Sequence, residues 1–424
     1  MVKVVRRLSF LDVFCLGLNA IIGSGIFLFP GTLAALAGPA SILAFLVCGL
    51  LLTTVALCYA ELGGMFPGNG GSYLYAREAF GDTAGFGVGL VAWAAAVLSW
   101  AAVASILAGH LGFFHPFFDA PAVRKAVAAG GLVVFGAVNY RGVKPGAWTV
   151  DFLTAAKVLP LLLFVIAGLS SVSPGRYAPL FSGEMRFGYA VFLALWALQG
   201  FEVVAIPAGE TECPQRDVPR AVVGSLVTAA VLYTLIQAVA VGAYPGLAGS
   251  SERPLADAAA HFMGSWGGGL LAVGGVVSML GFIAGAALGA PRYLSALGER
   301  SLLRWGLGAV HARFKTPHRS ILATTGTAVL LALAFDFGRL IDLSNLAVVS
   351  QYLASCLALA ALRVRRPQAP RPYRMPWARG IVPAGCLISV CLISQVGPRE
   401  VLGSTVLLAG GYALRAVLDR GGEP

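Results

Sequence analysis

An apolar segment near the N-terminus is interrupted at its middle. It reads NAIIGSGIF from Asn19 to Phe27, and Pro30 follows shortly after. A second apolar segment reads WALQGFE from Trp196 to Glu202, with Pro207 shortly after. Glycine and proline disfavour helix interiors, and unwound backbone at membrane depth is tolerated only where it faces protein or a wet cavity. We therefore expect two helices that are broken halfway through a bilayer.

The composition places these segments in a membrane. Of the 424 residues, 58% are apolar and only 12% are charged, and the mean hydropathy is +0.81. Soluble domains carry roughly 25% charged residues, so the charges here are too few to cover a globular surface. Apolar runs recur throughout the chain. Since about 20 apolar residues span a bilayer, the sequence predicts an all-α membrane protein with about 12 transmembrane helices.

The residues between these runs are too few for a separate soluble domain, so the whole chain, 1–424, is predicted to form one transmembrane domain. Lys and Arg gather in loops on the side of the N-terminus. The positive-inside rule therefore places both termini in the cytoplasm of a multi-pass plasma-membrane protein. This pattern explains the net charge of +11 without a nucleic-acid partner. The predicted segments are 9–36, 41–66, 84–114, 122–140, 148–169, 187–209, 221–244, 267–297, 320–335, 340–362, 380–396 and 401–418.

No sequence pattern indicates a metal site or a cofactor. The seven cysteines lie mostly in apolar runs, and neither they nor the histidines have metal-ligand spacing. The spans also lack the clustered catalytic groups of a membrane-embedded enzyme, such as paired aspartates or a Ser/His set. We expect a protein that is not an enzyme and needs no metal or cofactor.

Interrupted helices are typical of secondary transporters. The half-helix after a break presents free N–H groups and a positive dipole to a carboxylate, while unwound carbonyls accept hydrogen bonds from a cation. A zwitterionic amino acid carries both charges a few bonds apart. The two breaks lie five spans apart, which fits inverted five-helix repeats. The alternative for each glycine-rich stretch is close helix packing, because small residues are common where membrane helices meet.

Three stretches stand out together: the first break, the run from Tyr59 to Gly81 that begins YAEL and contains paired glycines, and the run from Gly200 to Arg220 that begins GFE. Together they resemble the amino acid–polyamine–organocation (APC) superfamily, and the resemblance covers essentially the whole chain. It implies a LeuT-type fold, in which two inverted five-helix repeats are followed by two peripheral helices. The first repeat would be 9–170, the second 187–362, and the peripheral helices 380–418.

The resemblance also implies a substrate site at the two breaks. The substrate carboxylate would meet a serine hydroxyl and N–H groups just after the first break, in a cradle that a side chain at Gly25 would fill. Its amino group would meet carbonyls beside both breaks. Aromatic residues beside the second break would be walls or gates, with plain helix packing as the alternative. The implied substrate-binding residues are Ile21, Ser24, Gly25, Ile26, Trp196, Gln199 and Phe201.

Lys157 lies well inside a predicted span. A cation at that depth costs about 2.5–3.5 kcal/mol on insertion scales. One alternative is that Lys157 snorkels to the nearer membrane surface. The other is that its ammonium reaches the carbonyls near Asn19 and Ile22. The resemblance supports this second alternative, because some proton-coupled members of the APC superfamily have a lysine at a similar place. There the lysine occupies the sodium position of sodium-coupled relatives. Because burial disfavours its charged form, Lys157 can exchange a proton, which favours proton coupling over sodium symport.

Glu202 follows directly on the second break, where we expect either a gating or proton-linked role or a structural hydrogen bond. No other acidic residue must face the pocket, which favours a neutral substrate over a cationic one. The predicted function is secondary active, proton-coupled and sodium-independent transport of amino acids by alternating access. An exchanger or exporter without proton coupling is the close alternative, and a membrane amino-acid sensor is the third. The expected partners are the amino acid, protons and the lipid bilayer; the oligomeric state is left open.

Overall fold

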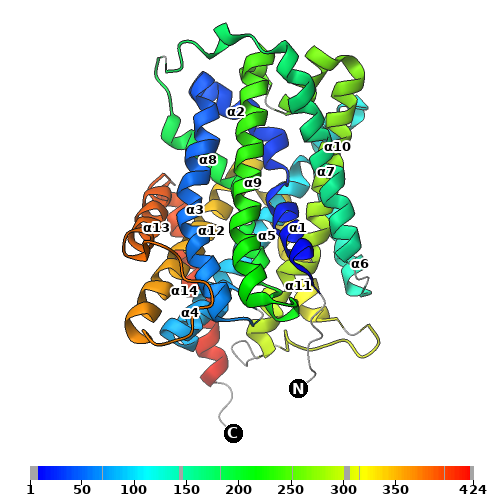
Figure 1. The fold of residues 1–424 in the computed structure, drawn as a ribbon. Helices are drawn as coiled ribbons and strands as arrows, with labels where there is room; N and C mark the ends of the chain where they lie inside the picture. Colours follow the sequence, from blue (N-terminus) through cyan, green and yellow to red (C-terminus); the bar gives the residue numbers. More distant parts are fainter. Residues whose placement is uncertain are drawn as a thin grey trace.

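The computed structural model describes residues 8–420, apart from 69, 143–146, 182, 251, 300–305, 315 and 396. Within these residues the regular structure is helical, except for one isolated bridge between Leu8 and Thr211. The helices form an elongated bundle, in which α1 begins and α14 ends at the same end (Figure 1). We call it the terminal end, and the opposite one the far end. The α-helices are α1 (Phe10–Ile21), α2 (Gly25–Ala37), α3 (Ser41–Met65), α4 (Ser72–Phe80), α5 (Asp82–Leu111), α6 (Pro121–Tyr140), α7 (Ala147–Gly168), α8 (Phe187–Leu198), α9 (Pro214–Ala243), α10 (Pro254–Glu299), α11 (His318–Ala334), α12 (Phe337–Arg365), α13 (Ala378–Ile393) and α14 (Pro398–Arg420).

Local sequence signals mark where several helices begin. At the start of α1, Ser9 Oγ accepts the Asp12 N–H at 3.3 Å and the Asp12 carboxylate accepts the Ser9 N–H at 2.7 Å. At the start of α12, the Asp336 carboxylate accepts the Arg339 N–H at 3.0 Å. Such caps satisfy N–H groups that have no partner inside the helix. These caps determine where the two helices begin, while the apolar runs determine the residues that follow in each helix.

The outer surface of the bundle is apolar. Large side chains such as Leu330, Ile166 and Leu50 are 69%, 67% and 63% exposed, as expected where lipid rather than water surrounds a protein. Eight helical stretches of the described residues are long and apolar enough to cross a membrane, and the shorter helices α1 and α13 are also apolar. The all-helical class is therefore confirmed, while the number of twelve crossings stays a prediction.

Each predicted segment coincides with a helix or with helices on either side of a break. Most helices start within three residues of the predicted bound, and two start much earlier. α9 begins at Pro214 rather than 221, because its first turns are polar and extend beyond the apolar run. α10 begins at Pro254 rather than 267, because a short helix precedes the span and is joined to it at Gly264, where φ is +74°.

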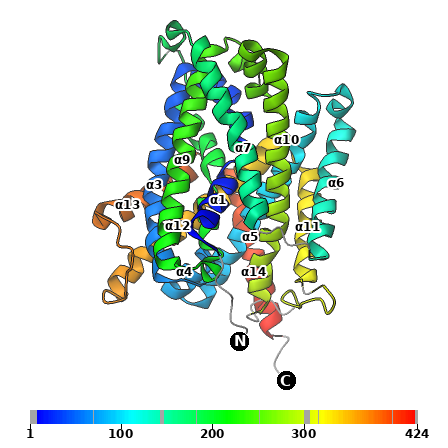
Figure 2. The same cartoon turned by 45° about the vertical axis from the view of Figure 1, so that its right-hand side comes forward.

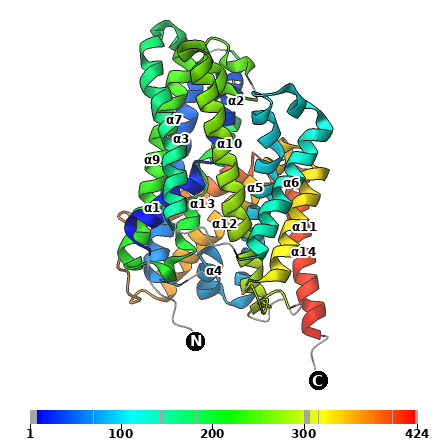
Figure 3. The same cartoon turned by 90° about the vertical axis from the view of Figure 1, so that its right-hand side faces the viewer.

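The arrangement of the helices surrounds the first break with other elements. α1 lies toward the terminal end and α2 toward the far end (Figures 1 and 3). α1 packs against α7, α9 and α10, and α2 packs against α8 and α10. α6 and α11 lie side by side on one edge of the bundle (Figure 2). Side chains from α7, α9 and α10 can therefore reach the backbone where α1 ends.

The basic connection between α12 and α13 is tied to the bundle by one buried carboxylate. Glu61 on α3 is fully buried and pairs with Arg363 and with Arg371, whose Nε lies 3.2 Å from Glu61 Oε1. The same carboxylate accepts the Met375 N–H at 3.0 Å. Breaking such a buried pair by removing one partner is costly, so Glu61 holds an otherwise irregular loop in one conformation.

Candidate functional site

Both predicted interruptions are present. α1 ends at Ile21 and α2 starts at Gly25, so residues 22–24 join two short helices instead of continuing one. α8 ends at Leu198, Gln199 is extended, and Gly200 has a φ of +122° before the 3-10 helix η5 (Phe201–Ala205) begins. Glycine adopts such a φ without steric cost, whereas other residues do not. Gly200 therefore determines where the second break falls.

The two breaks touch each other through two glycines. A Cβ on Gly25 would lie 2.6 Å from Ala197 Cα, and a Cβ on Gly200 would lie 2.7 Å from the carbonyl carbon of Ala20. Each glycine thus packs on the backbone of the other interrupted helix. A side chain on Gly25 would therefore clash with α8, and the carboxylate cradle expected at this position stays a prediction.

Lys157 lies on α7, and its side chain is fully buried. Its Nζ donates to Asn19 O at 3.2 Å and to Ile22 O at 3.1 Å. The last carbonyls of a helix lack N–H partners within the helix, and here the ammonium takes that place. The lysine therefore does not snorkel to the surface, and the structure brings it together with the two carbonyls named for it.

Hydroxyl groups from two further helices bind the same break. Ser278 Oγ on α10 lies within hydrogen-bond distance, 3.1 Å, of both Ile22 O and Gly23 O. Tyr233 OH on α9 donates to Ile21 O at 3.0 Å, and Gly23 N–H donates to the same oxygen at 2.8 Å. A carbonyl oxygen has two lone pairs, so the Ile21 carbonyl is fully used. The binding of the substrate amine by carbonyls near Ile21 stays a prediction.

A cavity of about 180 Å³ lies beside the two breaks and extends toward the terminal end as far as Leu16 and Tyr293. It is lined by α1, α5, α10, α12 and the residues that follow α8; among the predicted residues, Asn19, Gln199 and Glu202 face it. Pockets for drug-sized ligands have volumes of about 300–1,000 Å³, so this smaller central cavity suits a ligand of about the size of an amino acid. The predicted residues that do not line the central cavity are Ile21, Ile22, Ser24, Gly25, Ile26, Lys157, Trp196 and Phe201.

The two predicted aromatic walls pack against other rings. Trp196 meets Phe337 of α12 edge to face, with 6.4 Å between ring centroids. Phe201 is fully buried, stacks on Tyr352 at 5.1 Å and meets Tyr59 edge to face at 5.9 Å. Phe201 thus packs against rings of α3 and α12, and its role as a wall or gate stays a prediction. Trp196 joins α8 to α12 on the side of the breaks that faces the far end.

Polar atoms at the breaks remain without partners among the described residues. They include Ser24 Oγ, Asn19 Oδ1 and Gln199 Oε1, all of them buried. An unpartnered buried polar atom costs about 1–3 kcal/mol, and such atoms mark places where a ligand or water completes the hydrogen bonding. The site can therefore accept hydrogen bonds from, and donate them to, a small polar molecule.

Glu202 forms hydrogen bonds at the second break. Its Oε2 accepts the Gly200 N–H at 2.9 Å and the Tyr352 hydroxyl at 2.8 Å. The carboxylate thus joins η5 to α12 at the wall of the central cavity. The structural hydrogen bond weighed for Glu202 is present, and its gating or proton-linked role stays a prediction.

Sequence reasoning missed three hydroxyl groups at the breaks, those of Tyr233, Ser278 and Tyr352. Each lies in a largely apolar stretch of its helix. Such residues usually hydrogen-bond across helices in membrane proteins, which is the one local signal that marks them. Their partners come from distant parts of the chain, so the sequence alone does not pair them.

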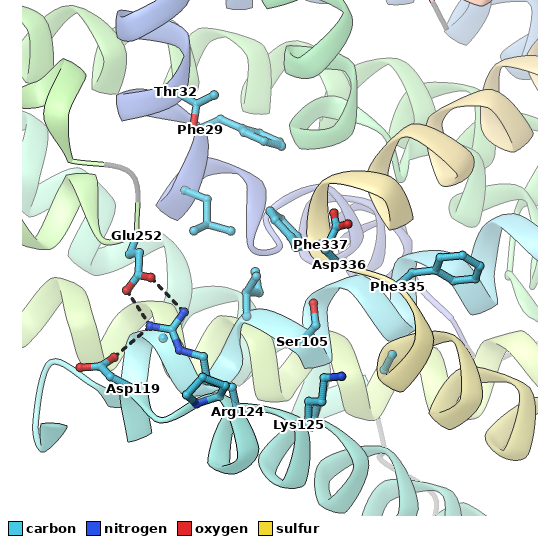
Figure 4. A pocket seen from close by; sticks show the side chains of 16 residues that line it. Phe29, Thr32, Ser105, Asp119, Arg124, Lys125, Glu252, Phe335, Asp336 and Phe337 are labelled. Carbon is cyan, nitrogen blue, oxygen red and sulfur yellow. Dashed lines mark hydrogen bonds and ion pairs between the residues drawn. The ribbon is translucent and has the colours of Figure 1, made fainter. Parts of the chain in front are cut away.

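A second cavity, of about 620 Å³, lies at the far end between α2, α5, α6 and the junction of α11 with α12. Figure 4 shows Arg124 at its side, where the guanidinium donates to Glu252 at 2.9 and 3.1 Å and to Asp119 at 3.1 Å. Lys125 Nζ donates to Leu333 O at 3.2 Å. Both basic side chains of this outer cavity are thus engaged by protein oxygens. The cavity was not predicted, because loops and helix ends far apart in sequence form it.

Helices broken beside a small central cavity are typical of one class of proteins, the secondary membrane transporters, in which substrate binds at the breaks. The chain belongs to the amino acid permease family, whose sequence model matches residues 8–410. This match confirms the resemblance to the APC superfamily and indicates a transporter rather than an enzyme. Together with the apolar helices, it makes the chain a multi-pass membrane protein.

Individual relatives agree in class and differ in substrate. The chain is 27% identical to the branched-chain amino acid permease BcaP of Bacillus subtilis (strain 168), over 98% of this chain and 93% of that protein. It is 27% identical to the serine/threonine exchanger SteT of the same organism, over 95% and 91% of the two chains. It is 28% identical to the methylthioribose transporter of that organism, over 92% and 88%. Family membership thus supports amino-acid transport, and the choice of substrate depends on the residues of the site.

Proposed function

We propose that this chain moves a neutral amino acid across the plasma membrane by alternating access, coupled to protons and independent of sodium. The observation that carries the proposal is the Lys157 ammonium on Asn19 O and Ile22 O. Unwound carbonyls in transporters of this class bind the coupling cation. A cation that belongs to the protein removes the need for sodium at this place, and it can lose and regain a proton.

The proton acts on the first break in this mechanism. Charged Lys157 holds α7 to the end of α1 through two charge-assisted hydrogen bonds, which are roughly twice as strong as neutral ones. Loss of the proton weakens that tether, and α1 moves more easily relative to α7. Because Asn19 both accepts from Lys157 and lines the central cavity, the tether and the substrate site share one residue.

The finer features of the fold belong to the same proposal. We infer a LeuT-type arrangement of two inverted repeats, 9–170 and 187–362, with peripheral helices in 380–418 and cytoplasmic termini. The reciprocal contacts of Gly25 with Ala197 and of Gly200 with Ala20 support a twofold relation between the repeats. The substrate carboxylate is assigned to the backbone and hydroxyl groups around Ser24. The unpartnered Ser24 Oγ supports that assignment.

Transport by the purified protein in liposomes tests the proposal. Uptake of labelled amino acids is measured in sodium-free buffer with an acidic or a neutral exterior. We expect faster uptake with the acidic exterior and its loss when a protonophore is added. Counterflow that does not depend on the proton gradient would indicate an exchanger instead. Binding of an amino acid without its transport would indicate a sensor.

A further inference from the structure

Three carboxamide side chains line the central cavity, and they come from three different elements. Asn19 is on α1, Gln199 lies in the second break, and Gln351 is on α12. Asn19 Oδ1 and Gln199 Oε1 have no hydrogen-bond donor among the described residues. Gln351 is only 3% exposed, and none of the hydrogen bonds found in the described part of the chain involves its side-chain amide. The cavity therefore presents amide groups that can still form hydrogen bonds with a ligand.

The rest of the cavity wall is mostly apolar, and its acidic side chain is Glu202; the larger apolar side chains that line it are Leu16, Val203, Ile206, Phe282 and Val348. The Glu202 carboxylate faces the cavity, but its Oε2 is held by Gly200 and Tyr352. The other cavity positions on α5 and α10 are mostly small, and they include Ala92, Ala95, Ala96, Gly281, Gly285 and Gly289.

Gln351 differs from the other two amides in its position. Asn19 and Gln199 belong to the interrupted helices, whose backbone groups are suited to the α-amino and α-carboxylate groups that all amino acids share. Gln351 belongs to α12, which is continuous at this position. Its amide is thus suited to the part of the ligand that varies, the side chain.

Hydrogen-bonding sites of this kind discriminate strongly against apolar ligands. An apolar side chain placed against a buried amide leaves that amide without partners, and one unmatched group costs roughly tenfold or more in affinity. A hydroxyl or carboxamide side chain completes the bonding, because it donates and accepts at once. We infer that the central cavity selects neutral amino acids whose side chains carry a hydroxyl or a carboxamide over branched-chain and cationic ones. This inference rests on the proposed transport function and names its substrate class.

Competition in liposomes tests the inference directly. Counterflow of labelled serine is measured while unlabelled serine, threonine, asparagine, glutamine, valine, leucine and lysine compete. We expect the hydroxyl and carboxamide amino acids to compete at concentrations roughly tenfold or more below those of valine and leucine. Stronger competition by leucine, valine or lysine would overturn the substrate class and leave transport intact. Failure of every amino acid to exchange would overturn the proposed function as well.

Variants of Gln351 separate its role in selection from its role in folding. Gln351→Met removes the amide at nearly constant volume, and we expect the preference for serine over valine to fall roughly tenfold. Gln351→Asn keeps a carboxamide and is expected to retain much of the preference. Gln395→Met, the same change at an exposed position on the outside of the bundle, should leave the preference unchanged. An unchanged preference for serine in a folded Gln351→Met variant would contradict recognition by the amide. If the Met variant does not fold, the Gln351→Asn variant decides. Loss of the preference in that variant, which keeps a carboxamide, would also contradict recognition by the amide.

Discussion

Lys157→Met is the substitution that tests most directly how the first break works. Methionine has nearly the length of lysine, without the charge and without hydrogen bonds to Asn19 O and Ile22 O. Ile22 O keeps Ser278 as a donor at 3.1 Å, so Asn19 O alone of the two loses its side-chain donor. An orphaned acceptor costs about 1–3 kcal/mol, and relief of the buried cation returns about 2.5–3.5 kcal/mol, so we expect the free energy of unfolding to change by less than about 3 kcal/mol.

A folded Lys157→Met variant then separates the effect of the proton on transport from the effects of the rest of the site. Uptake into liposomes is compared with an acidic and a neutral exterior, and thermal unfolding is recorded on the same preparation. We expect the wild type to transport faster with the acidic exterior and the variant to transport at the same rate under both conditions. Lys125→Met serves as the control, because this lysine also donates to a backbone carbonyl, Leu333 O, but lies at the outer cavity. Wild-type pH dependence in the Lys157 variant would refute the role of the lysine.

Two further substitutions test the contacts that shape the bundle. Gly200→Ala forces a φ of +122° on alanine and drives its Cβ into the backbone of α1; with a strain of about 1–3 kcal/mol, we expect a lower unfolding temperature and weakened amino-acid binding. Gly326→Ala, with nothing within 4 Å of the added carbon, should change neither, and equal behaviour of the two variants would contradict close contact of the breaks. Glu61→Gln leaves two arginines without their carboxylate and should destabilise the fold by about 3–5 kcal/mol. Glu78→Gln breaks partly exposed pairs and should cost about 1 kcal/mol or less, so a similar loss of thermal stability in both would argue against the buried tether.

The helices and both breaks could be predicted because local rules determine them. Apolar runs of bilayer length leave the backbone no alternative to a helix, and glycine beside polar residues in such a run weakens the helix at that point. Gly200 shows the rule at its clearest, since its φ is accessible to glycine and to few other residues. Lys157 was also identifiable, because a buried cation needs oxygen partners and the carbonyls of a broken helix are the nearest supply.

The partners at the site could not be predicted, because they depend on which helices meet. Nothing in the sequence around Tyr233 or Ser278 indicates that their hydroxyls bind the end of α1, over 200 residues away. The full use of Ile21 O and the packing of Phe201 against Tyr352 have the same cause. The contact of Gly25 with Ala197 could not be predicted either, because Ala197 lies on α8, far away in the sequence.

The donors at the first break differ in what a change of pH can do to them. Tyr233 and Ser278 hold Ile21 O and Gly23 O through neutral hydroxyls, so that part of the attachment persists whatever happens to the lysine. Lys157 holds Asn19 O and Ile22 O through a charge, and a neutral amine in its place would still donate, but with roughly half the strength. Loss of the proton would therefore loosen the end of α1 without releasing it. The residues held by hydroxyls would act as a pivot, and Asn19, which lines the central cavity, would lie on the part that moves.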